Sequence, residues 1–370
     1  MFRKSIVLVF FLIMASGLSQ EHKTIDNQLF SADLNFGYNL TRIKTNYFFE
    51  EKMPFSFQLN WQKANYINKN SLGKFGYSDF GLTFLYHDFR NKQIGKNYGL
   101  YAFMEYYLLK PAKGFQLSFR ISQGIAYNTN PYNKINNSKN LYFGGHFLFP
   151  FDIALYLKTP KIIQNWRMQF GLAIFHYSNG NLQSPNYGAN IPSLTLGLLY
   201  DGRKLPVIQE KIFPDFDKAW QYRAFLRFGI NESDYYDSGI YPFFIPGIQI
   251  DKHLSYRHKI YMGTELYLSY FLREQIRYEY YAQPEKQLDK IYDFKRVGIY
   301  VGHEFYYDKF GIDIAFGYYI YYPYQFETRF YNRLGTKYRI NNRWTALYSL
   351  KVHSINRAEA MEFGLMYRFK

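Results

Sequence analysis

The feature of this sequence that most constrains its fold is a repeated alternation of apolar and polar residues in which arginine occupies the polar face. In residues 220–229, one face holds Trp220, Tyr222, Ala224, Leu226 and Phe228, and the other holds Gln221, Arg223, Arg227 and Gly229. Successive side chains of a β-strand point to opposite faces, so the pattern predicts a strand with one apolar face. A soluble sandwich would bury these arginines, whereas a transmembrane β-barrel turns the apolar face to lipid and the polar face to its lumen.

The composition supports a membrane barrel. Aromatic residues make up 22% of the 370 residues, with 40 tyrosines and 37 phenylalanines, yet the mean hydropathy is negative. That mixture is too polar for a helical membrane protein, while aromatic girdles are typical of outer-membrane barrels. The net charge of +16 suits a surface of anionic lipid head groups. We predict no nucleic-acid partner, because the basic residues are scattered singly and the chain is expected to be exported.

Residues 1–19 are expected to form a secretory signal peptide. Arg3 and Lys4 precede an apolar run of roughly 10 residues, and small residues follow up to Ser19. The run is too short to cross a bilayer of about 30 Å as a helix. The sequence has no cysteine, so we expect neither a lipoprotein anchor nor disulfide bonds.

For residues 20–370 we predict a single all-β domain, a transmembrane antiparallel β-barrel of about 12–16 strands. The candidate strands are residues 31–39, 53–63, 77–88, 97–109, 114–128, 140–157, 165–178, 190–201, 219–230, 241–251, 257–271, 293–307, 310–322, 331–340, 343–354 and 359–369. The alternation is weakest at 31–39 and 331–340. If the first strand runs outward from the periplasm, the connection after the seventh strand, 165–178, lies outside the cell.

That connection lies in the stretch FHYSNGNLQSPNYGAN, residues 175–190, where a histidine and a serine stand two positions apart. The apolar face of the seventh strand continues to His176 and Ser178. The apolar face of the following strand extends back to Asn190. We therefore predict that all three side chains face lipid near the outer rim.

These residue types can hydrolyse an ester. His176 as general base would take the proton of the Ser178 hydroxyl, and Asn190 would orient the imidazole. The Asn179 side chain and the Gly180 backbone amide would stabilise the oxyanion. The alternative interpretation makes His176 and Ser178 boundary residues that are hydrogen-bonded to the turn.

The same stretch resembles the signature of the outer-membrane lipid A 3-O-deacylase family, the PagL-like acyloxyacyl hydrolases. The match is residue for residue at His176, Ser178, Asn179, Pro185, Asn186 and Gly188. The resemblance implies an enzyme that removes an ester-linked 3-hydroxyacyl chain from lipid A in the outer membrane of a Gram-negative bacterium. It also implies an active site at the outer leaflet, in which Asn186 and Gly188 join Asn179 and Gly180 in positioning the substrate.

The sequence departs from the family at one position, because the family's acid is replaced by Asn190. An asparagine can orient the imidazole but cannot stabilise imidazolium by charge, and an amide in place of a triad aspartate costs about 10⁴-fold in another fold. Three outcomes stay open: weaker activity, a charge supplied by another carboxylate, or loss of catalysis. The alternation of side chains along the strands does not place the acids Glu105, Glu265 or Glu304 beside His176.

Several alternatives also remain. A non-catalytic barrel, such as a porin, an uptake channel or a structural protein, could retain the motif, and a phospholipase would use the same site. His146 and His303 could line a lumen, although the simpler interpretation makes each an ordinary hydrogen-bonded histidine of the barrel. His303 and Glu304 are adjacent and point to opposite faces of a strand, which argues against a shared metal site. We predict no cofactor and no metal. The expected partners are lipid A or lipopolysaccharide and outer-membrane lipids, and a homodimer stays open.

Overall fold

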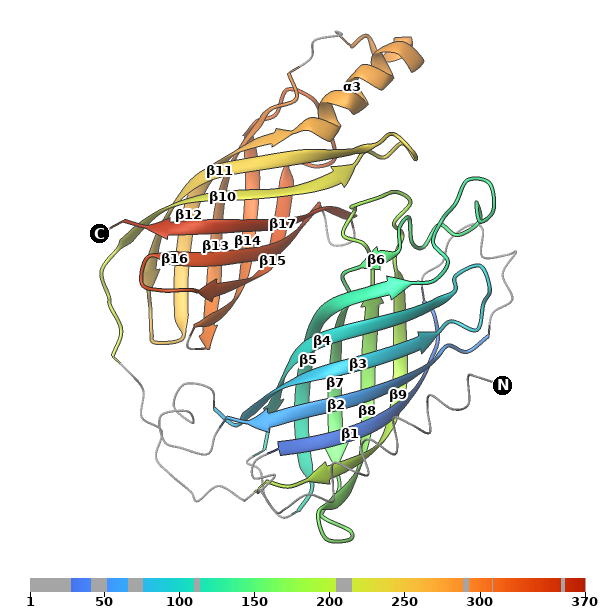
Figure 1. The fold of residues 1–370 in the computed structure, drawn as a ribbon. Coiled ribbons are helices and arrows are strands. Elements are labelled where there is room, and N and C mark those ends of the chain that lie inside the picture. The colour runs from blue at the N-terminus through green and yellow to red at the C-terminus, as the bar shows by residue number, and fades with distance from the viewer. Residues whose placement is uncertain are drawn as a thin grey trace.

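The computed structural model describes residues 28–40, 52–65, 76–109, 114–203, 215–288, 293–307, 309–353 and 357–369. The expected signal peptide lies outside these ranges. The described chain consists mainly of antiparallel strands, which form two barrels (Figure 1). The all-β antiparallel barrel class predicted from the alternation is confirmed.

The first barrel closes from eight strands. They are β1 (Gln28–Gly37), β2 (Phe55–Ala64), β3 (Ser78–Asp88), β4 (Lys96–Tyr107), β5 (Gln116–Asn128), β7 (Phe151–Lys158), β8 (Trp166–Tyr177) and β9 (Ala189–Asp201). Each strand pairs with the next, and β9 returns to β1 with Leu29 opposite Asp201. The short strand β6 (Phe147–Leu148) pairs with the end of β5.

The second barrel closes from the next eight strands. They are β10 (Gln221–Glu232), β11 (Ile240–His253), β12 (His258–Ser269), β13 (Arg296–Tyr307), β14 (Phe310–Tyr321), β15 (Phe330–Arg339), β16 (Trp344–His353) and β17 (Arg357–Arg368). Here β17 returns to β10, with Arg223 opposite Arg368.

The expectation of a single barrel over residues 20–370 is therefore wrong. The predicted strands are present, except that the segment 140–157 is strand only in β6 and β7. Both segments with the weakest alternation, 31–39 and 331–340, correspond to strands, β1 and β15. Alternation shows which face of a strand meets lipid, but it is the same whichever neighbour the strand pairs with. The closure of β9 on β1 therefore leaves no trace in the periodicity.

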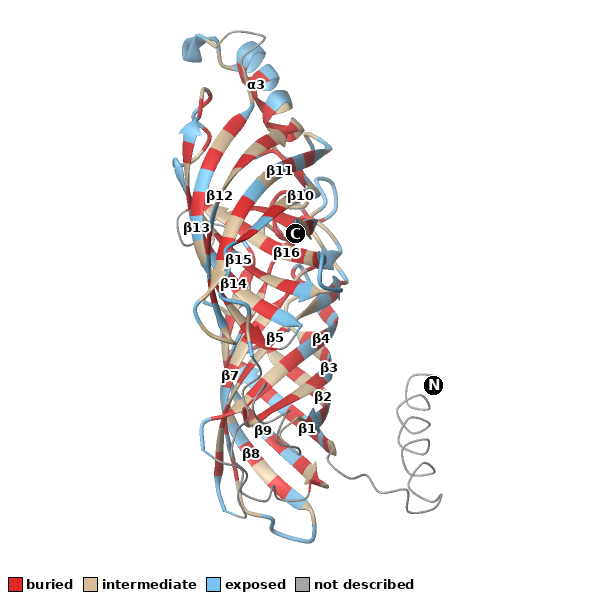
Figure 2. Ribbon diagram, turned by 90° about the vertical axis from the view of Figure 1, so that its left-hand side faces the viewer, coloured by how far each residue is buried: buried red, intermediate tan, exposed pale blue. Residues whose placement is uncertain are grey.

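The two faces of the strands separate as the alternation predicts. On β10, Tyr222 is 59% exposed and Phe228 is 44% exposed, whereas Arg223 and Arg227 are 8% and 4% exposed. Figure 2 shows the same alternation of buried and exposed residues along the strands of both barrels. The outward face is apolar, as a lipid-facing surface requires.

Buried ion pairs occupy both lumens. In the first barrel, Glu105 pairs with Arg120 at 2.8 Å and with Lys158. In the second barrel, Arg333 pairs with Glu265 at 3.1 Å and with Glu362 at 2.6 Å. The interior of an eight-stranded barrel is just wide enough for side chains to fill it.

One feature of the second barrel was not predicted. Residues after β12 form the helix α3 (Tyr270–Ala282), followed by the short 3-10 helix η2 (Pro284–Lys286). Phe271, Leu272 and Ile276 of α3 are buried against Tyr324 and Phe326. In the part of the chain that the structure describes, no helix is both long and apolar enough to cross a membrane.

Candidate active site

The predicted catalytic residues lie at one end of neighbouring strands β8 and β9. His176 is opposite Asn190 in the register of this pair. Nδ1 of His176 lies 2.8 Å from Oδ1 of Asn190. The strand pairing therefore fixes the contact that the sequence predicted between the imidazole and the amide.

The surroundings of His176 and Ser178 differ. His176 is half-buried and has the parity of Ile174, which is 47% exposed, whereas Phe175 and Tyr177 between them are buried inside the barrel. Ser178 lies just past the end of β8 and is only 7% exposed. The sequence predicted that both side chains face lipid on the apolar face of the strand. His176 lies on that face, but Ser178 is buried.

Ser178 is held by two backbone contacts. Its carbonyl accepts a hydrogen bond from the Phe149 amide at 2.8 Å. The Gly180 amide donates to the Ser178 hydroxyl oxygen at 3.4 Å. An amide that already points at the nucleophile can stabilise the charge that develops beside it. Of the two oxyanion donors predicted from the sequence, the Gly180 backbone amide is therefore the one that points at the Ser178 hydroxyl.

Asn179 and Asn186 hold the loop together. The Asn179 amide donates to Oδ1 of Asn186 at 2.9 Å, and its side-chain Nδ2 donates to the Gln183 carbonyl at 2.6 Å. The side chain of Asn179, predicted to be an oxyanion donor, is thus engaged within the loop. These contacts define the site loop, residues 178–188.

Gly188 closes the site loop against the side chains of Ser178 and His176. A Cβ atom at this position would lie 3.4 Å from Cβ of Ser178, 3.5 Å from Cε1 of His176 and 2.7 Å from the Tyr177 carbonyl. Gly188 also has a φ of +66°, which side chains other than glycine rarely adopt. The glycine of the motif therefore keeps open the space between Ser178 and His176.

An apolar groove of about 520 Å³ lies on the outer face of the first barrel beside the site. Its lining includes Ile174 of β8 and Pro192 of β9, which are paired two residues away from His176 and Asn190. Leu172, Leu194 and Leu155 extend the lining along the barrel wall. A hydrocarbon chain fits such a surface because all of these side chains are apolar.

None of the acids considered from the sequence supplies the carboxylate that the family has at the position of Asn190. Glu105 and Glu265 lie in the ion pairs of the two lumens, and Glu304 is buried with Lys259 at 2.9 Å. Among the residues that the structure describes, Asn190 is the side chain hydrogen-bonded to the His176 ring. The site therefore contains a Ser, a His and an Asn.

The other histidines considered lie outside the lumens. His146 is exposed, stacks on Tyr127 and contacts the Asn128 carbonyl at 2.8 Å. His303 is exposed and lies 3.1 Å from His258. The alternative in which these histidines line a lumen is wrong, because His146 is exposed and His303 lies on the outward face of β13. Its neighbour Glu304 faces inward, as predicted.

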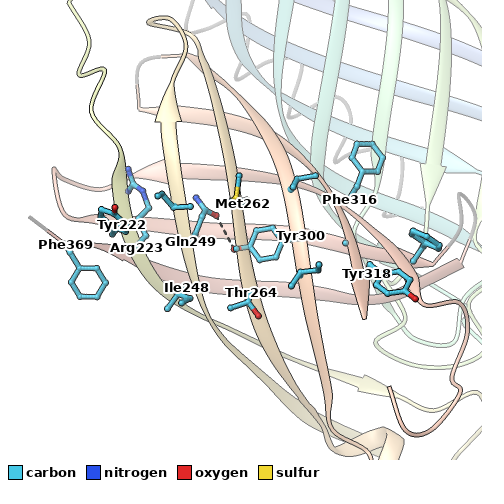
Figure 3. Close-up of a pocket in the computed structure, with 16 residues that line it drawn as sticks. Tyr222, Arg223, Ile248, Gln249, Met262, Thr264, Tyr300, Phe316, Tyr318 and Phe369 are labelled. Atoms are coloured by element: carbon cyan, nitrogen blue, oxygen red, sulfur yellow. Dashed lines mark hydrogen bonds between the residues drawn. The ribbon is translucent and has the colours of Figure 1, made fainter. Parts of the chain in front are cut away.

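A second groove, of about 840 Å³, lies on the second barrel (Figure 3). Its lining includes Tyr222, Ile248, Met262, Phe316 and Phe369, and none of the predicted site residues. Its apolar lining is the expected surface of a barrel that faces lipid.

The sequence did not reveal that the second barrel contacts the site loop. Ser184 of the loop donates its backbone amide to the Glu232 carboxylate at 2.7 Å. Asn181 donates to the Glu359 carbonyl at 3.1 Å. Both pairs join the first barrel to the second, over 48 and 178 positions of the sequence. No local sequence pattern could therefore have indicated them.

Comparison with known proteins gives two family matches. The family described as lipid A 3-O-deacylase (PagL) matches residues 53–198. The family described as acyloxyacyl hydrolase, C-terminal domain, matches residues 220–370. The first match ends at residue 198, within β9, and the second begins at residue 220, next to the start of β10, so each match corresponds to one barrel. No curated protein matches the sequence.

Several solved structures are similar at low scores. The outer membrane enzyme PagL is 16% identical over 48% of this chain and 99% of that chain, with a TM-score of 0.30. The KdgM porin is 7% identical over 92% of this chain and 99% of its own, with a TM-score of 0.19. Omp33 of Acinetobacter baumannii is 9% identical over 93% and 99%, with a TM-score of 0.19. The assignment of this chain to a family rests on the two family matches and not on these structures.

Proposed function

Because the chain belongs to the PagL family of outer-membrane acyloxyacyl hydrolases, we propose that Ser178 and His176 hydrolyse an ester-linked 3-hydroxyacyl chain of lipid A. The observation that most supports this proposal is the 2.8 Å contact between the His176 ring and Oδ1 of Asn190. This contact fixes the orientation of the imidazole at the end of β8, two residues before Ser178.

The contact also selects a tautomer. An amide oxygen accepts a hydrogen bond, so Nδ1 of His176 carries the proton and Nε2 is free to act as the base. Nε2 takes the proton of the Ser178 hydroxyl as the serine oxygen attacks the ester carbonyl. His176 then gives that proton to the sugar oxygen as the ester bond breaks, and a water molecule hydrolyses the acyl-serine by the same steps.

The Gly180 amide is the proposed oxyanion donor. It lies 3.4 Å from the serine oxygen in the resting site, and a carbonyl oxygen attacked by Ser178 would develop its negative charge nearby. Preorganised amides of this kind typically contribute about 10²- to 10³-fold in rate. Gly188 leaves the space that the tetrahedral intermediate needs.

The acyl chain would lie in the apolar groove beside the site. Ile174 and Pro192 connect the groove to His176 and Asn190 through the strand pair. A lipid A molecule in the outer leaflet would present its sugar ester at the rim and its hydrocarbon chain along the barrel wall. The proposed site would then lie at the outer leaflet of a Gram-negative outer membrane.

The porin and uptake-channel alternatives receive little support from the lumens. Each barrel has eight strands, and charged side chains such as Arg120 and Arg333 are buried within them. A water-filled channel of the porin type needs a wider barrel, of about 16 strands. A non-catalytic structural protein remains the outcome if the activity test fails.

The proposal is tested by mass spectrometry of lipid A from Gram-negative cells that express wild type, Ser178→Ala or His176→Ala. Wild type is expected to remove one hydroxyacyl chain, and both variants are expected to leave lipid A intact. Equal acylation in all three strains would contradict the proposal. Phospholipids from the same cells are analysed in parallel, and wild-type-dependent lysophospholipid with intact lipid A would indicate a phospholipase.

A further inference from the structure

We propose that the second barrel is a positioning element for the esterase site, in which Glu232 and Met361 hold the middle of the site loop. This inference rests on the proposed function of Ser178 and His176. It assigns a role in the reaction to a barrel that supplies none of the catalytic residues.

Two outward-facing positions of the second barrel are buried against expectation. On β10, Glu232 has the parity of the exposed residues Phe228 and Ile230, but it is 2% exposed. On β17, Met361 has the parity of Phe363, which is 39% exposed, but it is 5% exposed. The strands β10 and β17 are neighbours, so both residues lie in one patch of the barrel wall. The site loop of the first barrel covers this patch.

Glu232 binds the loop at Ser184. Its carboxylate accepts the Ser184 amide at 2.7 Å and the Gly239 amide at 3.3 Å. The Ser184 hydroxyl donates to the Ser233 carbonyl at 2.9 Å. Charge-assisted hydrogen bonds from a buried carboxylate are roughly twice as strong as neutral ones. Glu232 therefore fixes the backbone at Ser184 firmly.

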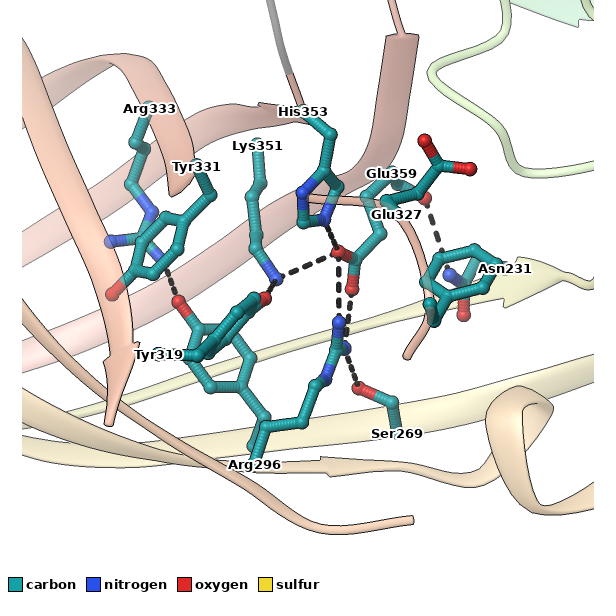
Figure 4. Close-up of polar contacts among 12 residues, drawn as sticks. Asn231, Ser269, Arg296, Tyr319, Glu327, Tyr331, Arg333, Lys351, His353 and Glu359 are labelled. Carbon is teal, nitrogen blue, oxygen red and sulfur yellow. Dashed lines mark hydrogen bonds and ion pairs between the residues drawn. The ribbon is translucent and has the colours of Figure 1, made fainter. Parts of the chain in front are cut away.

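Asn181 binds a second point. Its side-chain Nδ2 donates to the Glu359 carbonyl at 3.1 Å, and its own carbonyl accepts the Glu232 amide at 3.4 Å. The Glu359 side chain is held by Arg296 at 2.6 Å and Lys351 at 2.8 Å, and by His353 (Figure 4). The acceptor for Asn181 thus belongs to a cross-linked part of the second barrel.

Met361 packs on the loop at Gly180. A Cβ atom on Gly180 would lie 2.0 Å from Cγ and 2.8 Å from Sδ of Met361, and the glycine has a φ of +63°. The Gly180 amide is the donor that points at the Ser178 hydroxyl. The side chain of Met361 is therefore in contact with the residue proposed to stabilise the oxyanion.

The anchors of the loop divide between the two barrels. The first barrel holds the loop ends, through the Phe149 amide at Ser178 and the Tyr142 carbonyl at Gly188. The second barrel contacts Gly180, Asn181 and Ser184 in the middle. Because a misplacement of about 1 Å can cost about 100-fold in rate, an anchor in the middle of the loop matters for catalysis.

The first experiment compares purified full-length wild type, Glu232→Ala, Glu232→Gln and Asp234→Ala in lipid A deacylation. Glu232→Ala is expected to lower kcat about tenfold and to change KM less than twofold, because it releases the loop without touching the acyl groove. Glu232→Gln can accept only one of the two amides, so its kcat is expected to lie between those of Glu232→Ala and wild type. Asp234 is at the same rim and pairs with Arg357 at 2.6 Å, and its variant is expected to match wild type.

A second pair of variants covers the case in which Glu232→Ala fails to fold. Met361→Ala removes the contact with Gly180, whereas Met366→Ala removes a methionine buried inside the same barrel. Both are expected to reduce thermal stability, but only Met361→Ala is expected to lower kcat, about tenfold. Folding of every variant is checked by its heat-dependent electrophoretic mobility.

The outcomes separate the two proposals. Wild-type kcat in folded Glu232→Ala and Met361→Ala would overturn the positioning role, and so would equal kcat in Met361→Ala and Met366→Ala. Activity in Ser178→Ala equal to wild type would instead overturn the proposed function. A tenfold loss in Glu232→Ala that is partly recovered in Glu232→Gln supports the positioning role.

Discussion

At the scale of single residues, the proposed hydrolysis depends on Asn190. The sequence predicted that it contacts His176, because the alternation puts both side chains on the outward face where two consecutive strands meet the same loop, and the register of β8 and β9 pairs them. It did not place Glu232 or Met361 at the site, because their contacts come from the packing of two separate barrels. Local periodicity therefore predicts neighbours within a strand pair and leaves contacts between barrels undetermined.

The substitution Asn190→Asp is expected to raise kcat about tenfold. A carboxylate would accept the Nδ1 proton as the amide oxygen does and would also stabilise the imidazolium that forms during attack, as triad aspartates do. Asn190→Ala is the matched control and is expected to lower kcat about 100-fold. Equal kcat in the Asp and Ala variants, measured on lipid A, would show that residue 190 does not orient His176.

Gly188→Ala is expected to abolish most activity. The new Cβ would lie 2.7 Å from the Tyr177 carbonyl and within 3.5 Å of both Ser178 and His176. Its left-handed backbone would also cost about 1–2 kcal/mol. Gly114→Ala is the control, since a Cβ there meets nothing within 4 Å. Similar activity and thermal stability in the two variants would contradict the packing described for Gly188.

At the scale of elements, the strands were predictable and the helix was not. Each strand shows period-two alternation because one face meets lipid and the other the lumen. The helix α3 was missed because its buried residues, Phe271, Leu272, Gln275, Ile276 and Glu279, include polar groups. Without a continuous apolar stripe, the segment resembled a long polar connection.

The docking of α3 is expected to weaken in acid. Burial raises the pKa of Glu279, but hydrogen bonds from Lys286, Tyr324 and Tyr235 outweigh this effect and hold the pKa below its ordinary value of 4.5. A carboxyl group with a lowered pKa stabilises the folded state above pH 4.5, and this contribution is lost as the pH falls through the lowered value.

Hydrogen exchange of residues 270–282, corrected for the intrinsic rate, measures this effect. In wild type, the protection of these amides is expected to decrease as the pH falls below 4.5. In Glu279→Gln, protection is expected to be lower at neutral pH and to change little with pH. An identical pH dependence in both proteins would show that Glu279 does not control the docking of the helix.

At the scale of the whole molecule, the chain combines two narrow barrels with different roles. The first contains His176, Ser178 and Asn190, and the second covers the loop between them. The sequence predicted one barrel of 12–16 strands, which would have left room for a channel. The structure instead has two barrels of eight strands, and charged side chains are buried in each lumen. The strand count alone could not distinguish these architectures.

The purified protein is expected to produce no stepwise current in planar lipid bilayers. The lumens hold buried ion pairs such as those of Glu105 and Arg333, and eight strands leave an interior that side chains can fill. A porin of known conductance serves as the positive control. Reproducible steps that depend on the concentration of this protein would indicate an open lumen.

The most direct test of the central claim is the release of free fatty acid from purified lipid A by the purified full-length protein. Wild type is expected to release one 3-hydroxy fatty acid per lipid A molecule, detected by mass spectrometry, and folded Ser178→Ala is expected to release none. Release by Ser178→Ala at the wild-type rate, or no release by folded wild type, would contradict the account of an esterase built on His176, Ser178 and Asn190.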